Sequence, residues 1–302
     1  MTMLRLRSLA AFGAFALAAA ATAQPGPGPL FPEPFRVTHH LVQDDGDGSR
    51  FVGEPVVDTY GGSWIVSERP DGSRLVVDLA RRELTEVRTE KGTYWTVSFD
   101  RFAELQKRLR AAQGLAPEPD GTAEKAAARP APELVVTEVT AEAAPKSGTS
   151  LADRPGVRRL RVTRKDTEKS GAAAPLLDVW VDPSVRLTPA ALGAVSSLET
   201  VLTGPDAADP AAVPPGRALA AVRVKAAGAL PVRTVRPLPV PGAQVEDETT
   251  RLERLERFPS ELAQIPEGLR RVPHPLESVV RFLEEDAERN AAMAGRKTGQ
   301  KP

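Results

Sequence analysis

Metal coordination would need histidines and carboxylates that can reach one ion, and the chain has three histidines, His39, His40 and His274. His39 and His40 are neighbours in a segment whose pattern predicts a β-strand. Successive side chains of a strand point to opposite faces, so we do not expect these two imidazoles to share a metal ion. His274 lies between two prolines, in an expected turn. The histidines therefore predict no common metal site.

An acidic stretch at residues 43–54 invites a calcium interpretation. Counted from Gln43, the residues Asp45, Asp47, Gly48 and Glu54 fall on the third, fifth, sixth and twelfth positions of an EF-hand loop. The first position carries a neutral amide instead of a carboxylate, and the flanking segments look like strands instead of helices. We expect a solvated hairpin turn here, with calcium binding weak or absent, and the EF-hand site remains the alternative.

Other catalytic chemistry finds little support in the sequence. There is no Gly-x-Ser-x-Gly elbow, phosphate-binding loop or dinucleotide fingerprint. The absence of cysteine excludes disulfides, thiol catalysis and a lipid-modified cysteine anchor. Lys plus Arg and Asp plus Glu number 40 each, so no net charge favours nucleic acid. We expect a protein that is not an enzyme, has no cofactor and does not bind nucleic acid.

The first 23 residues have the parts of a secretory signal peptide. Arginines precede an apolar, alanine-rich run at residues 9–21, and small residues lead up to Ala23. We expect cleavage between Ala23 and Gln24, and a soluble periplasmic or secreted protein with no transmembrane segment. The alternative is a membrane anchor, although the run is shorter than the roughly 20 residues needed to span a bilayer.

The clearest elements follow in residues 60–113. Apolar residues alternate with polar ones over several short runs separated by turn residues, and the period then changes to that of a helix. Ser98 is the expected N-cap of this helix. The expected strands are 63–67, 74–79, 83–89 and 93–99, and the expected helix is 99–113.

Further strands and helices are expected on both sides of this meander. Residues 24–34 are rich in Pro and Gly and predict an extended lead-in, and Pro183 is expected to end a strand. Thr188 followed by Pro189 predicts the start of a helix. Residues 217–225 fit either a helix or a strand. The remaining expected strands are 36–43, 50–59, 133–140, 157–164, 176–182, 231–240 and 244–257; the helices are 188–203 and 275–293; and mobile loops are expected near 114–132 and 141–156.

The three tryptophans each fall in an expected strand and mark either the packed interior or a cavity wall. The helix at 99–113 adds an apolar stripe that is expected to cover the sheet. Alternation cannot separate a cavity wall from a filled core, because both show the same pattern. The candidate cavity-lining residues are Trp64, Trp95, Val97, Phe99, Phe102, Leu105, Leu109 and Trp180.

Three short motifs resemble a known family. They are TYWTVSFD at 93–100, LDVWVDP at 177–183 and PSELAQIPEGLRRV at 259–272. In this order, with a helix after each of the first two, they resemble a family of uncharacterised bacterial periplasmic proteins related to the lipoprotein carriers LolA and LolB. The long loops at 114–132 and 141–156 and the segment after Pro275 lie outside the family pattern.

The resemblance implies an α+β fold, in which a curved antiparallel sheet forms a half-open barrel and helices cover its concave face. It implies a single domain over 35–272. The apolar periodicity after Pro275, which is outside the resemblance, predicts a terminal amphipathic helix followed by a polar tail, at 273–302. The resemblance also implies a carrier for a lipid, an acyl chain or a lipidated protein. The alternative is an envelope interaction module that has a filled core and docks an envelope protein through its loops or terminal helix.

Overall fold

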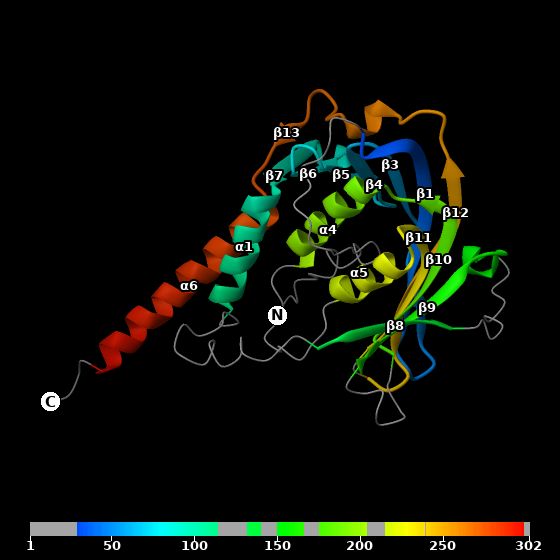
Figure 1. Ribbon diagram of the computed structural model, residues 1–302. Coiled ribbons are helices and arrows are strands. Elements are labelled where there is room, and N and C mark those ends of the chain that lie inside the picture. The colour runs from blue at the N-terminus through cyan, green and yellow to red at the C-terminus, as the bar shows by residue number, and fades with distance from the viewer. Residues whose placement is uncertain are drawn as a thin grey trace.

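The computed structural model describes residues 29–113, 132–139, 150–165, 175–203, 215–238 and 240–298. In these parts of the chain, one sheet of 13 strands forms the centre of the protein, and four α-helices accompany it (Figure 1). The strand pairs are antiparallel except for β13, which runs parallel to β7. The α+β class expected from the sequence is thus confirmed.

The strands run through the sheet in the order β13-β7-β6-β5-β4-β3-β1-β12-β11-β10-β9-β8, with β2 pairing beside β1. The early strands are β1 (Phe31–Asp44), β2 (Arg50–Val52), β3 (Val56–Gly62), β4 (Trp64–Glu68), β5 (Ser73–Asp78), β6 (Glu83–Arg88) and β7 (Thr93–Ser98). The later strands are β8 (Leu134–Val139), β9 (Arg158–Arg164), β10 (Leu177–Arg186), β11 (Ala229–Pro237), β12 (Gln244–Arg254) and β13 (Arg270–Arg271).

One face of the sheet, here called the helix face, carries the apolar residues that pack against helices in both halves of the molecule. Ile65 of β4 stands opposite Val77 of β5, and Leu84 of β6 stands opposite Val97 of β7. Opposed residues of an antiparallel pair point to the same side, so these four side chains form one apolar row. The helices α4 (Pro189–Thr203) and α5 (Pro215–Lys225) lie on this face, within the bend of the sheet (Figure 1).

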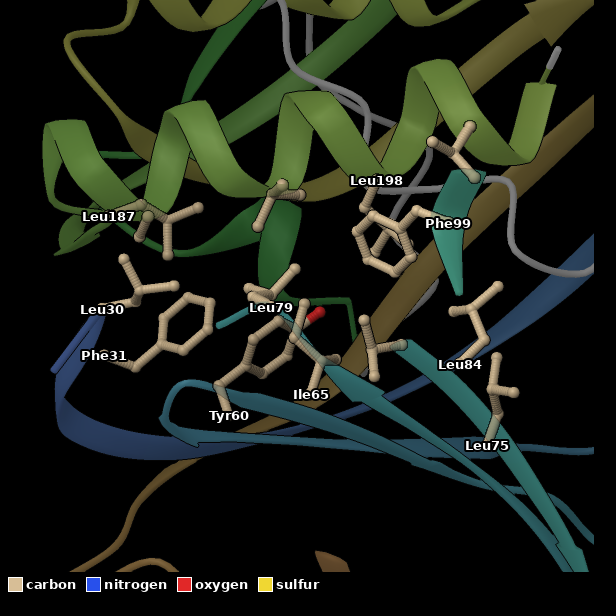
Figure 2. Close-up of a cluster of buried hydrophobic side chains, with 14 of the residues drawn as sticks. Leu30, Phe31, Tyr60, Ile65, Leu75, Leu79, Leu84, Phe99, Leu187 and Leu198 are labelled. Carbon is tan, nitrogen blue, oxygen red and sulfur yellow. The ribbon is translucent and has the colours of Figure 1, made fainter. Parts of the chain in front are cut away.

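The main core lies between strands β3 to β7 and the helices α1 (Phe99–Ala112) and α4, and Figure 2 shows its side chains. Helix α1 begins as expected, because the Ser98 side chain accepts a hydrogen bond from the backbone of Arg101. A second cluster forms where α5 packs on β9 and β10, around Leu160, Val179 and Leu219. The helices α1, α4 and α5 therefore bury their apolar sides against the helix face.

The last helix, α6 (Pro275–Thr298), lies beside α1 and then continues away from the sheet (Figure 1). The guanidinium of Arg108 on α1 donates two hydrogen bonds to the carboxylate of Glu284, at 2.9 and 2.6 Å. Phe282 of α6 is 61% exposed. This helix extends a few residues beyond the expected 275–293.

The segment that follows β12 crosses the opposite face of the sheet, here called the outer face. The ring of Phe258 stacks on Trp64 at a centroid distance of 5.7 Å. A Cβ atom at Gly61 would meet that ring at 2.5 Å, so the close approach requires glycine at this position. The segment then reaches β7, where Arg270 pairs with Thr93.

Some elements differ from the sequence-based expectation. Residues 50–59 divide into β2 and β3, and residues 217–225 belong to a helix. Pro183 does not end its strand, because β10 continues to Arg186; the expectation was wrong since a proline can occupy a bulge without ending a strand. The lead-in is also shorter than expected, because β1 begins at Phe31.

The expected signal peptide at 1–23 lies outside the described residues, as do residues 114–131 of the expected loop at 114–132 and residues 141–149 of the expected loop at 141–156. The remainder of that second loop includes the short helix η3 (Leu151–Asp153), which packs near Trp180.

Candidate functional site

A half-open pocket of about 350 Å³ lies where the first strand meets the end of β10. Residues 30–35 form one lip, residues 183–188 form the other, and Arg254 of β12 completes the rim. The volume is at the lower end of the range typical of small-molecule sites. The pocket is therefore large enough for a slender ligand.

The sequence explains why the backbone separates here. Pro32 and Pro34 have no backbone N–H to donate, and the pairing of β1 with β3 shifts register between Phe31 and Phe35. On the other lip, Pro183 lacks the same donor, and the pairing of β10 with β11 shifts between Asp182 and Arg186. Such irregularities bend strands and interrupt their ladders. The prolines on both lips thus produce the opening.

The floor of the pocket is the end of the main core. Five lining side chains are at most 9% exposed and also belong to the core cluster. The ring of Phe35 stacks on Tyr60 at 4.5 Å, and Phe31 meets Tyr60 edge-on at 5.5 Å. Figure 2 shows Leu30, Phe31 and Leu187 gathered at this end of the cluster. The five floor residues are Leu30, Phe31, Phe35, Val185 and Leu187.

The rim of the pocket is polar. Arg254 donates one hydrogen bond to the backbone oxygen of Ser184 at 2.9 Å and lies 3.4 Å from the carboxylate of Glu33. Thr188 joins the lips, because its hydroxyl donates to the backbone oxygen of Leu30 at 3.1 Å. The same hydroxyl accepts from the backbone of Ala191 and so caps α4. An apolar floor under a charged rim suits an amphiphilic ligand.

Six of the eight residues expected to line a cavity lie together in the main core. Five of them are at most 7% exposed, and Leu109 packs against them. They fill space between the helix face and α1, and none of them lines the pocket. The six residues are Trp95, Val97, Phe99, Phe102, Leu105 and Leu109.

The other two candidates, Trp64 and Trp180, lie on the outer face. Trp64 alternates with core residue Ile65 along β4 and stacks on Phe258. Trp180 alternates with Val179 along β10, and its ring lies 4.8 Å from the guanidinium carbons of both Arg159 and Arg233. Alternation thus places both rings away from the helices.

A buried polar cluster lies on the helix face, behind the aromatic floor. The imidazole of His39 is 2.9 Å from the carboxylate of Asp247 and 3.3 Å from that of Asp58. Tyr60 donates to Asp58 at 3.4 Å, and Arg223 of α5, 2% exposed, faces the same group. Burial lowers the pKa of His39, but the two carboxylates raise it more, so the net pKa is well above its ordinary value. The two carboxylates therefore favour the charged form of His39.

A second polar cluster anchors the start of α6. The indole of Trp95 donates to buried Glu86 at 2.7 Å, and the ring of His274 meets Trp95 edge-on at 4.3 Å. Burial lowers the pKa of His274 to about 4, so its imidazole is neutral and Nδ1 accepts the backbone N–H of Leu276. Neither polar cluster lines the pocket. Both hold elements of the fold together.

The acidic stretch at 43–54 forms a hairpin turn between β1 and β2. Val42 pairs with Val52, and the side chains of Asp44 and Asp47 accept backbone hydrogen bonds within the turn. Among the residues that the structure describes, no group of three or more His, Asp or Glu is placed to hold a metal ion. In the same residues, no helix has the length and apolar character needed to cross a membrane.

Comparisons with known proteins add little to this geometry. No protein-family model matches the chain, and a search of curated proteins finds no match. Among solved structures, the chain is similar to an uncharacterized conserved protein from Thermus thermophilus, with 9% identity and a TM-score of 0.34. That match covers 80% of this chain and 90% of the other. A likeness at this level carries no inference about function.

The pocket was not among the sites expected from the sequence. Residues 24–34 read as an extended lead-in because of their prolines, although Phe31 and Phe35 stand four residues apart at its end. The other lip, residues 183–188, was not predicted, because we expected the strand to end at Pro183. The sequence signal for the first lip was the presence of prolines next to aromatic residues. Only the pairing of the strands in the structure shows that the two lips meet.

Proposed function

We propose that this protein is a non-enzymatic carrier or sensor that holds an apolar chain, such as a lipid or acyl group, in the pocket between β1 and β10. In this proposal the curved sheet is a half-open barrel of the LolA and LolB type. The protein acts in the periplasm or outside the cell after residues 1–23 are removed. The observation that carries the proposal is that the main core reaches the surface at the floor of the pocket.

The proposed binding depends on the continuity between the pocket and the core. A ligand chain that enters between the lips contacts Leu30, Phe31 and Leu187, which already pack on other core residues. Burial of such a chain removes apolar surface of both partners from water, at about 25 cal/mol per Å². No catalytic group is needed for this function.

Titration with the neutral fluorescent probe N-phenylnaphthylamine tests the proposal. The exported protein without residues 1–23 should bind the probe, and the exposed rim substitution Ser184→Trp should weaken binding by filling the mouth of the pocket. Ser49→Trp, in the exposed turn between β1 and β2, is the matched control and should leave binding unchanged. Absence of probe binding by the unsubstituted protein would exclude an apolar carrier.

A second candidate function is an interaction module with a filled core, and helix α6 favours it. This helix leaves the body of the protein beside α1 and exposes Phe282 at 61% (Figure 1). A helix that projects from the body can present its exposed side to a groove of an envelope protein. Native mass spectrometry of protein purified from its export compartment separates the two functions, because a bound lipid mass supports the carrier and its absence favours the module.

A further inference from the structure

More basic than acidic residues line the pocket. Arg186 and Arg254 line it together with one acidic residue, Glu33. The pair between Arg254 and Glu33 spans 3.4 Å, and the two side chains are 65% and 81% exposed. Such an exposed pair contributes little, so Arg254 can exchange Glu33 for another anion at small cost. The rim therefore has an excess of positive charge.

Helix α4 adds to this positive potential. Its residues begin at Pro189, directly after the lining residue Thr188, so the amino end of a 15-residue helix lies next to the pocket. The aligned peptide dipoles of a helix give its amino end a partial positive charge. The helix end and both arginines favour the same kind of ligand group.

The position of the arginines fixes how such a ligand would lie. Arg186 and Arg254 are exposed at the rim, whereas Leu30 and Phe31 are buried in the floor. A ligand with one charged end can place that end in water beside the guanidinium groups and its chain against the core. Guanidinium groups bind carboxylates and phosphates through charge-assisted hydrogen bonds.

We propose that the ligand is a single-chain amphiphile with an anionic head, a carboxylate or a phosphate ester, held at the rim by Arg186 and Arg254. This inference rests on the proposed function, namely that the pocket holds an apolar chain. The head stays at the surface, and the chain enters between residues 30–35 and 183–188.

Competition against N-phenylnaphthylamine tests the head-group preference, with three ligands of equal chain length kept below their micelle concentrations. Decanoate and decyl phosphate carry the two anionic heads, and decanol carries none. We expect the dissociation constant of at least one anion, measured by displacement of the probe, to be roughly tenfold lower than that of decanol, because charge-assisted hydrogen bonds can supply this difference. Whichever anion binds more tightly identifies the head group.

Substitutions on the rim connect this preference to particular residues. The double substitution Arg186→Gln with Arg254→Gln should reduce anion binding to the level of decanol while the neutral probe still binds. Glu33→Gln should strengthen anion binding, because it removes the competing carboxylate. Arg251→Gln, on the same strand but outside the pocket, is the control and should change nothing.

Two different failures remain distinguishable. If the probe binds and decanol displaces it as well as both anions do, the head-group inference is overturned and the apolar pocket stands. If the double substitution leaves the anion preference intact, the assignment to Arg186 and Arg254 is overturned. If the probe does not bind at all, the proposed function fails first.

Discussion

At the scale of residues, the charge of His39 is the most consequential feature of the interior. Its imidazole contacts Asp58 from β3 and Asp247 from β12. Tyr60 from β3 donates to Asp58, and Arg223 from α5 acts on Tyr60. The two carboxylates raise the pKa of His39 above that of an unfolded chain. A histidine whose pKa is higher in the folded protein than in the unfolded chain stabilises the fold. This stabilisation is complete at pH values below the pKa of the unfolded chain, and it is lost as pH rises through the pKa of the folded protein.

We therefore expect the free energy of unfolding to fall as pH rises above about 6.5, the unfolded pKa of histidine. Nuclear magnetic resonance should show the His39 ring titrating above that value. Asp247→Asn should lower this pKa, because it removes the charge nearest to the ring. Urea unfolding at several pH values gives the matching change in stability.

Asp45→Asn removes a carboxylate from the exposed turn and is the control, expected to leave the His39 titration unchanged. His40→Gln assigns the resonances, since only two other histidines then remain. A His39 ring that titrates below its unfolded value would contradict the expected charge.

Part of this residue-scale picture could be predicted from the sequence. Strand periodicity correctly indicated that His39 and His40 point to opposite faces: His39 contacts Asp58 and Asp247, and His40 lies 3.7 Å from Glu248. The partners themselves could not be predicted. Asp247 is 208 residues away from His39, and no local pattern specifies a pairing over that distance.

At the scale of elements, the crossing of the segment after β12 over β3 depends on Gly61. Gly61→Ala should lower the free energy of unfolding by about 1–3 kcal/mol, the usual cost of overpacking. The added Cβ would meet the Phe258 ring at 2.5 Å. Denaturant unfolding measures the change.

Gly193→Ala, in the first half of α4, is the matched control and should raise the free energy of unfolding instead of lowering it. A Cβ atom there meets nothing within 4 Å, so replacing glycine should stabilise the helix by about 0.5–1 kcal/mol. Equal effects of the two substitutions would mean that Phe258 does not pack on Gly61.

Periodicity located most elements within a few residues, because period-two alternation and helical spacing reflect which side chains are buried. The capping residues Ser98 and Thr188 were also predicted correctly, since capping is a local interaction. Pairing between distant strands is not local. For that reason the sequence did not show the pocket, or that Trp64 and Trp180 lie on the outer face.

At the scale of the whole molecule, the question is whether the interior is filled or covered by a removable lid. Leu105 of α1 is fully buried in the main core. Leu105→Ala should therefore cost the full amount for a packed site, about 2–5 kcal/mol of the free energy of unfolding. Probe binding should survive, because Leu105 does not line the pocket.

Lys107→Ala, on the exposed side of the same helix, should change stability by no more than about 0.5 kcal/mol. A much smaller loss for Leu105→Ala, together with weakened probe uptake, would instead mean that α1 is a lid over a ligand cavity.

The two halves of the sheet meet where β1 pairs with β12. One half carries the main core with α1 and α4, and the other carries the second cluster with α5. His39 and Asp247 join the halves on the helix face, so the charged cluster lies at the centre of the molecule. The stability of the whole sheet depends on this pair of strands.

Because β1 and β12 are far apart in the sequence, β1 is synthesised long before its partner strand. The ribosome makes β1 first, and the partner of His39, Asp247, is made 208 residues later, which takes on the order of ten to forty seconds at about 5–20 residues per second. Throughout that interval one edge of β1 has no partner from its own chain. Unpaired edges invite pairing between neighbouring nascent chains. Until β12 is available, we therefore expect this edge of β1 to be a site of association between chains.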